Sequence, residues 1–259
     1  MSEAQRFLRY VTPGLVFLAE ALFLLVILLP GWTVDQLERV KGDQALGVVF
    51  ATLLASGGVG FIFSALHHEA HWTPINRFGR ARLGEIPAID HSGLIARLRA
   101  ANIIELVNAE TDTPIAAEVT VSRPDAWVVA TSMWHERLTT SEQIRGAEPR
   151  AGTLIDMTHT TGTARVASAV AWLAALAVAA SVVGADVADF SLKLGPVLCF
   201  IFANVIGALL FVMHRRNYRR VSYLAQGVIE EVLHDALLAE LHRPVRTRVL
   251  LTRQNAPPR

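Results

Sequence analysis

Four long apolar blocks constrain the fold of this chain more than any other feature of its sequence. They cover Val11–Pro30, Ala45–Leu66, Val166–Ala185 and Pro196–Met213, and together they contain a single charged side chain, Glu20. At a rise of about 1.5 Å per residue, each block is long enough as a helix to cross a hydrocarbon core about 30 Å thick. We therefore exclude a soluble protein and predict an all-α integral membrane protein with four transmembrane helices.

Arginines near the ends of these blocks predict the orientation. Basic residues beside membrane helices tend to remain in the cytoplasm. Eleven arginines lie on the side of both chain termini, against Arg39, Lys41 and Lys193 on the other side. We therefore expect both termini in the cytoplasm. The excess of Arg over Lys is typical of a GC-rich bacterial genome, so the expected location is the bacterial inner membrane.

The chain is expected to have four segments. Residues 1–66 and 166–213 form two transmembrane hairpins, with helices at about 11–30 and 45–66 in the first and at 166–185 and 196–213 in the second. Residues 67–165 form a mostly helical cytoplasmic insert between the second and third transmembrane helices. Residues 214–259 form a C-terminal cytoplasmic amphipathic helix and a basic tail.

Capping signals predict three helices in the insert. Asp90 is a predicted N-cap for a helix over His91–Glu110. The pattern Ser122-Arg-Pro-Asp125 predicts a helix over Pro124–Leu138, because Pro is favoured at early helical positions. Thr139 and Glu142 repeat the signature and predict a short third helix that ends near Gly146 and Pro149. Residues 115–121 are compatible with either a short strand or an extended link.

The C-terminal segment contains no proline over His214–Leu241, and its apolar side chains recur with helical spacing. We expect this stripe to pack on the insert, on a second subunit or on lipid. Its members are Val221, Leu224, Ala225, Val228, Val232, Leu233, Ala236 and Leu237.

Small residues recur at four-residue spacing within three of the apolar blocks. In a membrane, such rows favour close helix packing, because lipid tails remove most of the hydrophobic drive for association. The rows are Thr52, Ser56, Gly60 and Ser64; Ala167, Ala171, Ala175 and Ala179; and Ala203 with Gly207. They predict tight contacts within one chain or between copies in a homo-oligomer.

Glu20, Ser56 and Asn204 each lie at the midpoint of an apolar block, so they are expected to form a polar layer at the same depth. A charged carboxylate at the bilayer centre is costly, and it should face the bundle interior or a hydrated cavity or be protonated. Two interpretations remain open. The layer fixes helix register through hydrogen bonds, or Glu20 serves an ion or proton pathway.

Histidines gather at the expected cytoplasmic face. His67 and His71 lie four residues apart on one helix face, as metal ligands would, and His159 precedes the third block. These three residues are candidate ligands for iron or zinc. The alternatives are a pH-responsive cluster, or interfacial side chains with no ligand, and on that last interpretation no cofactor is expected.

Lipid is the other partner that the sequence indicates. Four arginines directly follow the fourth block and are candidate ligands for anionic headgroups: Arg215, Arg216, Arg219 and Arg220. The net charge of +1 gives no reason to expect a nucleic-acid partner. The single cysteine, Cys199, excludes an intrachain disulfide.

Three function classes fit these features. The first is an oligomeric, channel-like or membrane-perturbing effector or sensor that is gated through its cytoplasmic part, for example in bacterial stress or phage defence. The second is a membrane metalloenzyme that uses the histidines. The third is a membrane-anchored scaffold that recruits a soluble protein partner. We favour the first and do not expect an enzyme.

Overall fold

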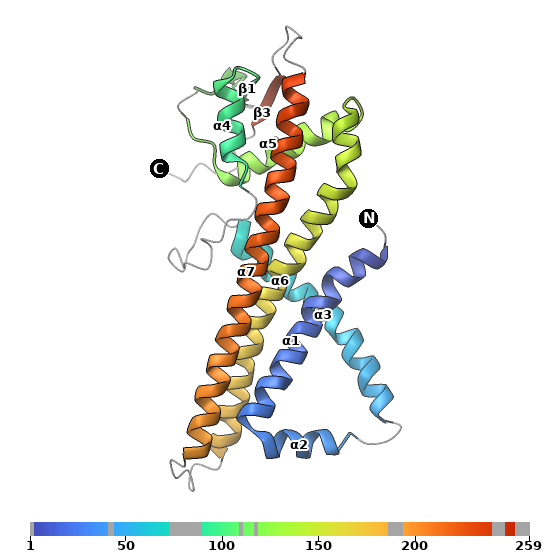
Figure 1. The fold of residues 1–259 in the computed structure, drawn as a ribbon, viewed down its shortest axis with the longest axis vertical. Coiled ribbons are helices and arrows are strands. Elements are labelled where there is room, and N and C mark those ends of the chain that lie inside the picture. Colours follow the sequence, from blue (N-terminus) through green and yellow to red (C-terminus); the bar gives the residue numbers. More distant parts are fainter. Residues whose placement is uncertain are drawn as a thin grey trace. The chain divides into compact units, whose positions relative to one another are not determined.

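The structure is a computed structural model that describes residues 3–40, 44–72, 90–108, 111–116, 119–185, 194–239 and 247–251. In this part of the chain it contains seven helices and three short strands. Four helices are long and apolar enough to cross a membrane: α1 (Glu3–Leu28), α3 (Gln44–Trp72), α6 (Glu142–Ala185) and α7 (Leu194–Ala239) (Figure 1). The prediction of four such helices is confirmed. Each helix begins before its apolar block, and α1 ends at Leu28, two residues before the end of its block.

The chain divides into two compact units. Unit 1 comprises residues 1–85 and 156–221, and unit 2 comprises residues 86–155 and 222–259. This division differs from the four expected segments, and α3, α6 and α7 run without a break through the three positions where we expected segment boundaries. The C-terminal amphipathic helix is therefore not a separate element but the second half of α7.

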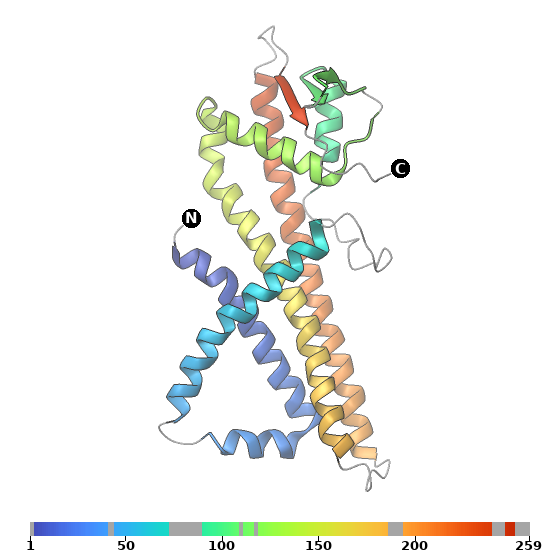
Figure 2. The same cartoon turned by 180° about the vertical axis from the view of Figure 1, so that it is seen from behind.

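In unit 1, α1 and α3 cross each other (Figure 2). The expected loop after the first block contains a further short helix, α2 (Pro30–Glu38), whose first residue is proline, a residue favoured at that position. The hydroxyl group of Thr33 donates to the carbonyl oxygens of Leu25 and Leu29, at 3.0 and 2.8 Å. The same two carbonyl oxygens also accept backbone N–H bonds, Leu25 from Leu29 and Leu29 from Thr33, so the hydroxyl adds a second bond to each at the junction of α1 and α2.

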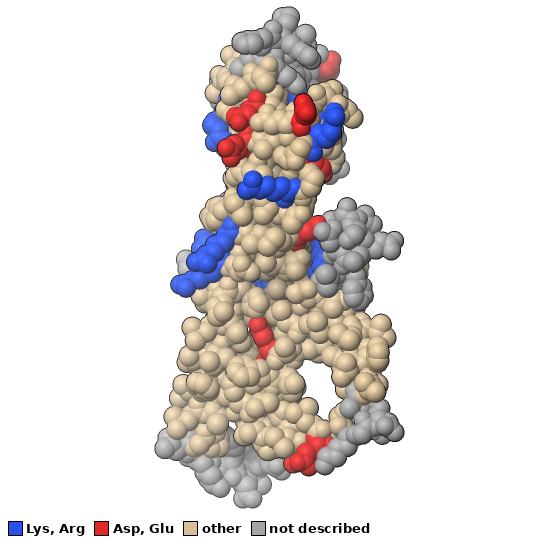
Figure 3. All heavy atoms as spheres, turned by 45° about the vertical axis from the view of Figure 1, so that its right-hand side comes forward, with Lys and Arg blue, Asp and Glu red and all other residues tan. Residues whose placement is uncertain are grey.

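Much of the surface of unit 1 is apolar. Large apolar side chains are exposed along α3 and the first part of α7, for example Leu54, Phe61 and Phe202. Figure 3 shows one face on which charged side chains are sparse over the apolar helices. Such a surface fits contact with lipid or with a further copy of the chain, rather than with water.

In unit 2, the first helix of the insert is shorter than predicted. The helix α4 spans Ser92–Ala100 and does not continue to Glu110. Asn102 adopts a positive φ of 55° directly after it. The N–H groups of Asn102 and Ile103 donate to Arg99 and Leu98, which is the Schellman arrangement that ends helices. The amide of Ser92 is bound by the Asp90 carboxylate at 3.0 Å, although the cap residue itself is His91.

A small sheet follows this helix end. The strand β1 (Ile104–Asn108) pairs antiparallel with β2 (Thr113–Pro114) and parallel with β3 (Thr247–Leu251), in the order β2-β1-β3. A parallel pair needs a long connection, and here α5, α6 and α7 all lie between β1 and β3. Residues 115–116 and 119–121 contain no strand.

The second predicted helix of the insert is confirmed as α5 (Arg123–Arg137), and the Ser122 side chain accepts a hydrogen bond from the Asp125 amide, as an N-cap should. The third prediction is wrong in its end point. The helix α6 begins at Glu142, with Ser141 bound to the Ile144 amide, but it continues through Gly146 and Pro149. Proline weakens a helix interior, so tertiary packing of this stretch overrides the local signal.

The core of unit 2 contains α4, α5, β1 and the unit's parts of α6 and α7. Most of the predicted stripe on α7 is buried or half-buried there, so it packs on the insert, one of the three expected alternatives. Leu224 is the exception because it is 52% exposed, and Ile229, which the stripe omitted, is buried.

Candidate functional site

The charged side chain of the first apolar block is held by a histidine on another helix. In unit 1, the ring nitrogen Nε2 of His214 on α7 lies 2.7 Å from Oε1 of Glu20 on α1. The Glu20 side chain is 12% exposed and that of His214 is 23% exposed. Oε2 of Glu20 is buried and has no hydrogen-bond partner among the described residues. The carboxylate is thus half satisfied in a surrounding of apolar helices.

Apolar packing one turn farther along α1 positions this pair. Leu24 is fully buried against Ala175 of α6 and Ala203 of α7. Close approach of α6 and α7 is possible because Gly207 has no side chain: a Cβ atom there would lie 2.7 Å from the ring of Trp172. Small residues therefore allow α1, α6 and α7 to meet, and Glu20 reaches His214 from this contact.

The structure does not join the three members of the predicted polar layer. Ser56 donates to the carbonyl oxygen of Leu53, and Asn204 donates to that of Phe200, so each bonds within its own helix. Asn204 precedes His214 on α7 by ten residues, which is about 15 Å along the helix axis. The midpoints of two blocks need not share a depth, because helices differ in tilt and length. The partner of Glu20 is the residue that directly follows the C-terminal end of the fourth block.

Small residues occupy the crossing of α1 and α3. A Cβ atom added at Gly14 would overlap the backbone of Ser56, and one added at Gly60 would overlap the carbonyl group of Tyr10. Both helices therefore meet backbone to backbone. Ser56, Gly60 and Ser64 are buried, and Thr52, the first member of the predicted row, is half-buried.

The rows on α6 and α7 are similarly placed. In unit 1, four members are almost fully buried and Ala179 is half-buried: the buried alanines are Ala167, Ala171, Ala175 and Ala203. Gly207 is also buried and faces Trp172. These contacts lie within one chain.

The candidate metal ligands lie in an aromatic cluster. The His67 ring meets those of His159 and Tyr218 edge-on, with centroids 6.4 and 5.5 Å apart, and His68 lies 4.8 Å from His159. The His71 side chain lies outside the described residues. Among the side chains that the structure describes, no group of three His, Cys, Asp or Glu is placed to hold a metal ion.

Gly162 makes room for this cluster. A Cβ atom at that position would overlap the ring of His67 and lie 2.9 Å from that of Tyr218. Across the Tyr218 ring, the guanidinium carbon of the buried Arg165 lies 5.0 Å from the centroid, within range of a cation–π interaction. The sequence analysis missed Gly162 and Tyr218, because nothing in the local sequence indicates that they meet.

The four predicted lipid-binding arginines follow the apolar part of α7. Arg216, Arg219 and Arg220 are exposed, and Arg215 is half-buried. Their side chains are accessible, as contact with anionic headgroups requires.

A polar network in unit 2 ties α4 to α7. Gln226 exchanges hydrogen bonds with the backbone of Asp90 and donates to Glu230, and Arg97 donates to the other Glu230 oxygen at 2.8 Å. His91 lies 3.4 Å from the same carboxylate. Burial acts to raise the pKa of Glu230, but the contacts from His91, Gln226 and Arg97 outweigh it and hold that pKa below its ordinary value. Glu230 lies seventeen residues beyond the apolar block, outside the expected membrane segment.

Comparisons with known protein families, with curated protein sequences and with solved structures find no match to this chain. Function must therefore be inferred from the geometry of the two units.

Proposed function

We propose that the chain is a multi-pass membrane protein that forms a gated, channel-like pathway for protons or small cations, with Glu20 and His214 as the ion-binding pair. The observation that carries this proposal is the buried, half-satisfied carboxylate of Glu20. Oε2 offers an acceptor to a proton or a cation, and His214 holds the other oxygen in place. Carboxylate and imidazole groups can both carry a proton, so the pair has the chemistry that a proton pathway needs.

A purely structural role explains this pair poorly. The contacts between α1 and α3 and between α6 and α7 depend on small residues and backbone approach, and need no charge. A carboxylate among apolar helices costs free energy unless it is compensated, and here one of its oxygens has no described partner. Ionisable groups in such positions are functional candidates for this reason.

We further propose that unit 2 regulates the pathway. The helix α7 supplies His214 to unit 1 and the core residue Leu233 to unit 2. Because both residues belong to the same helix, we propose that a conformational change in unit 2 acts through α7 on His214, the residue that holds Glu20. Exposed apolar faces on α3 and α7 support assembly of several copies.

Flux through liposomes tests the proposal. Purified protein is reconstituted into vesicles loaded with a pH-sensitive dye, and proton and potassium flux are measured after a gradient is imposed. We expect flux above that of empty vesicles, and a loss of tenfold or more for Glu20→Gln. The matched control is Asp35→Asn, which changes an exposed carboxylate on α2 and should leave flux unchanged. Absence of flux, or equal flux for Glu20→Gln and wild type, would refute the role of Glu20.

Two further measurements test the proposed oligomeric state and membrane orientation. Native mass spectrometry should show more than one copy per particle, whereas a monomer would contradict the proposed assembly of several copies. Fusions of alkaline phosphatase test the proposed inner-membrane orientation with both termini in the cytoplasm: a fusion after Arg39 should be active, and one after Arg220 should be inactive. The reverse pattern would overturn this orientation.

A further inference from the structure

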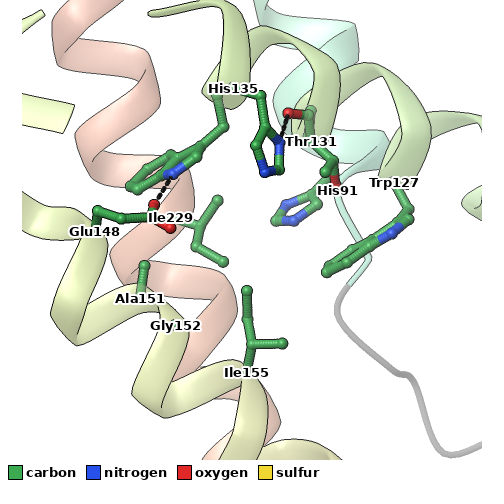
Figure 4. Close-up of a pocket in the computed structure, with 11 residues that line it drawn as sticks. His91, Trp127, Thr131, His135, Glu148, Ala151, Gly152, Ile155 and Ile229 are labelled. Carbon is green, nitrogen blue, oxygen red and sulfur yellow. Dashed lines mark hydrogen bonds between the residues drawn. The ribbon is translucent and has the colours of Figure 1, made fainter. Parts of the chain in front are cut away.

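Unit 2 contains a cavity that the proposed pathway does not use. Its volume is about 130 Å³. The walls come from α5, α6, one residue of α7 and the residue that precedes α4, all within unit 2 (Figure 4). The lining residues that carry the argument are His91, Trp127, Trp134, His135, Glu148 and Gly152.

Aromatic rings form the walls. The rings of Trp127 and His91 are stacked, with centroids 5.7 Å apart and planes inclined by 15°. Trp134 follows Trp127 by seven residues, about two turns along the same face of α5, and its indole N–H donates to the Glu148 carboxylate. His91 and Trp134 are only 1% and 6% exposed, so packing holds both rings in position. The walls are thus preformed surfaces with electron-rich faces.

The lining of the cavity contains an acidic side chain but no lysine or arginine. Glu148 is its only Asp or Glu. His135 places Nδ1 2.8 Å from the Thr131 carbonyl oxygen, an acceptor, so this ring nitrogen is the donor of that hydrogen bond. An anionic ligand would therefore meet a carboxylate with no Lys or Arg to balance it. A neutral apolar ligand would desolvate Glu148 without compensation.

We propose that this cavity binds a small organic ammonium ion. Aromatic faces attract such cations, Trp most strongly, and a nearby carboxylate neutralises the charge. The volume fits a ligand of about five to eight heavy atoms, since a cavity of about 150 Å³ accepts benzene. Methyl or methylene groups of the ligand contact Trp127 and Trp134, and its charge faces Glu148. The site is independent of whether the chain conducts ions.

Calorimetric titration of the full-length protein in a maltoside detergent tests this site. The probe is choline, and its uncharged isostere 3,3-dimethyl-1-butanol is the matched control. At 150 mM NaCl we expect choline to bind at least about tenfold more tightly than the isostere. Equal affinity for both would overturn the proposal, because shape alone would then explain binding. The ammonium group could belong to a free small molecule or to a lipid headgroup, and phosphocholine distinguishes the two. Weaker binding of phosphocholine than of choline indicates a free ammonium ion as the ligand. Tighter binding of phosphocholine would overturn that assignment in favour of a headgroup.

Three variants locate the site. Glu148→Gln should weaken choline binding about tenfold or more, whereas Glu142→Gln, at an exposed position on the same helix, should not. Gly152→Leu should abolish binding by filling the cavity. Nothing lies within 4 Å of a Cβ atom at Gly152, so the first atom of the new side chain meets no clash, and an unchanged circular dichroism spectrum checks that the fold accepts the rest. Choline binding that survives both Glu148→Gln and Gly152→Leu would refute the site.

Discussion

The crossing of α1 and α3 makes a sharp prediction about two glycines on one helix. At Gly60, a Cβ atom would overlap the carbonyl group of Tyr10 on α1, whereas at Gly58 nothing lies within 4 Å of such an atom. Gly60→Ala and Gly58→Ala therefore make the same chemical change two residues apart. Only the first creates a clash, and that clash involves backbone atoms, so no rotation of a side chain can relieve it.

Gly60→Ala should lower the stability of the protein, whereas Gly58→Ala should leave it unchanged or raise it. Overpacking usually costs about 1–3 kcal/mol, and a backbone clash belongs at the upper end of this range. A loss of about 3 kcal/mol reduces the folding equilibrium constant roughly a hundredfold. At Gly58, alanine is the better helix former by up to about 1 kcal/mol, with no steric cost. We therefore expect Gly60→Ala to be less stable than Gly58→Ala by about 2–4 kcal/mol.

Unfolding in mixed micelles with increasing sodium dodecyl sulfate measures this difference. Tryptophan fluorescence and far-ultraviolet circular dichroism should report the same transition, which licenses a two-state analysis. The midpoint should fall for Gly60→Ala and stay level or rise for Gly58→Ala. If the two variants unfold within about 0.5 kcal/mol of each other, the resolution expected for such comparisons, the backbone contact between α1 and α3 is refuted.

Three further predictions concern unit 2 of the intact chain. Leu233→Ala removes a fully buried side chain and should cost about 2–5 kcal/mol in unfolding free energy, whereas Leu238→Ala, at a partly exposed site, should cost much less; equal costs would contradict the core. Ser122→Ala should cost about 1 kcal/mol by removing the cap of α5, measured by chemical denaturation, and Ser122→Thr should largely restore it. Because its pKa is lowered in the folded state, Glu230 stabilises the protein above its ordinary pKa, and this contribution is lost as the pH falls through the folded value. Glu230→Gln should therefore destabilise at pH 7 but not at strongly acidic pH, unlike Glu231→Gln, which should have little effect at either; a pH-independent difference would contradict the network.

The sequence was sufficient to predict the long apolar helices and the amphipathic stripe on α7. These features follow from local composition and periodicity, which any environment of sufficient thickness preserves. The capping signal at Ser122 was equally local, and α5 begins where it predicts. The end of α4 was also readable in principle, since Asn102 is a residue type that tolerates the left-handed conformation that ends helices.

Other features depend on contacts between distant residues. The partner of Glu20 is separated from it by 194 positions, and the midpoint of a block gives no measure of helix tilt. The continuation of α6 through Pro149 likewise depends on the core of unit 2, against the local preference. The cavity beside Trp127 and Glu148 combines residues from several elements, so no single motif could reveal it.

The pairing of β1 with β3 has a consequence during synthesis. β1 is complete at Asn108, but its parallel neighbour begins only at Thr247. At a translation rate of about 5–20 residues per second, roughly 7–30 s pass between the emergence of the two strands. During that interval one hydrogen-bonding edge of β1 is open to any nascent or misfolded polypeptide nearby. Ribosomal stalling or premature termination in the second half of the gene would leave that edge permanently unpaired, and the resulting fragments should be early targets for holdase chaperones and proteases.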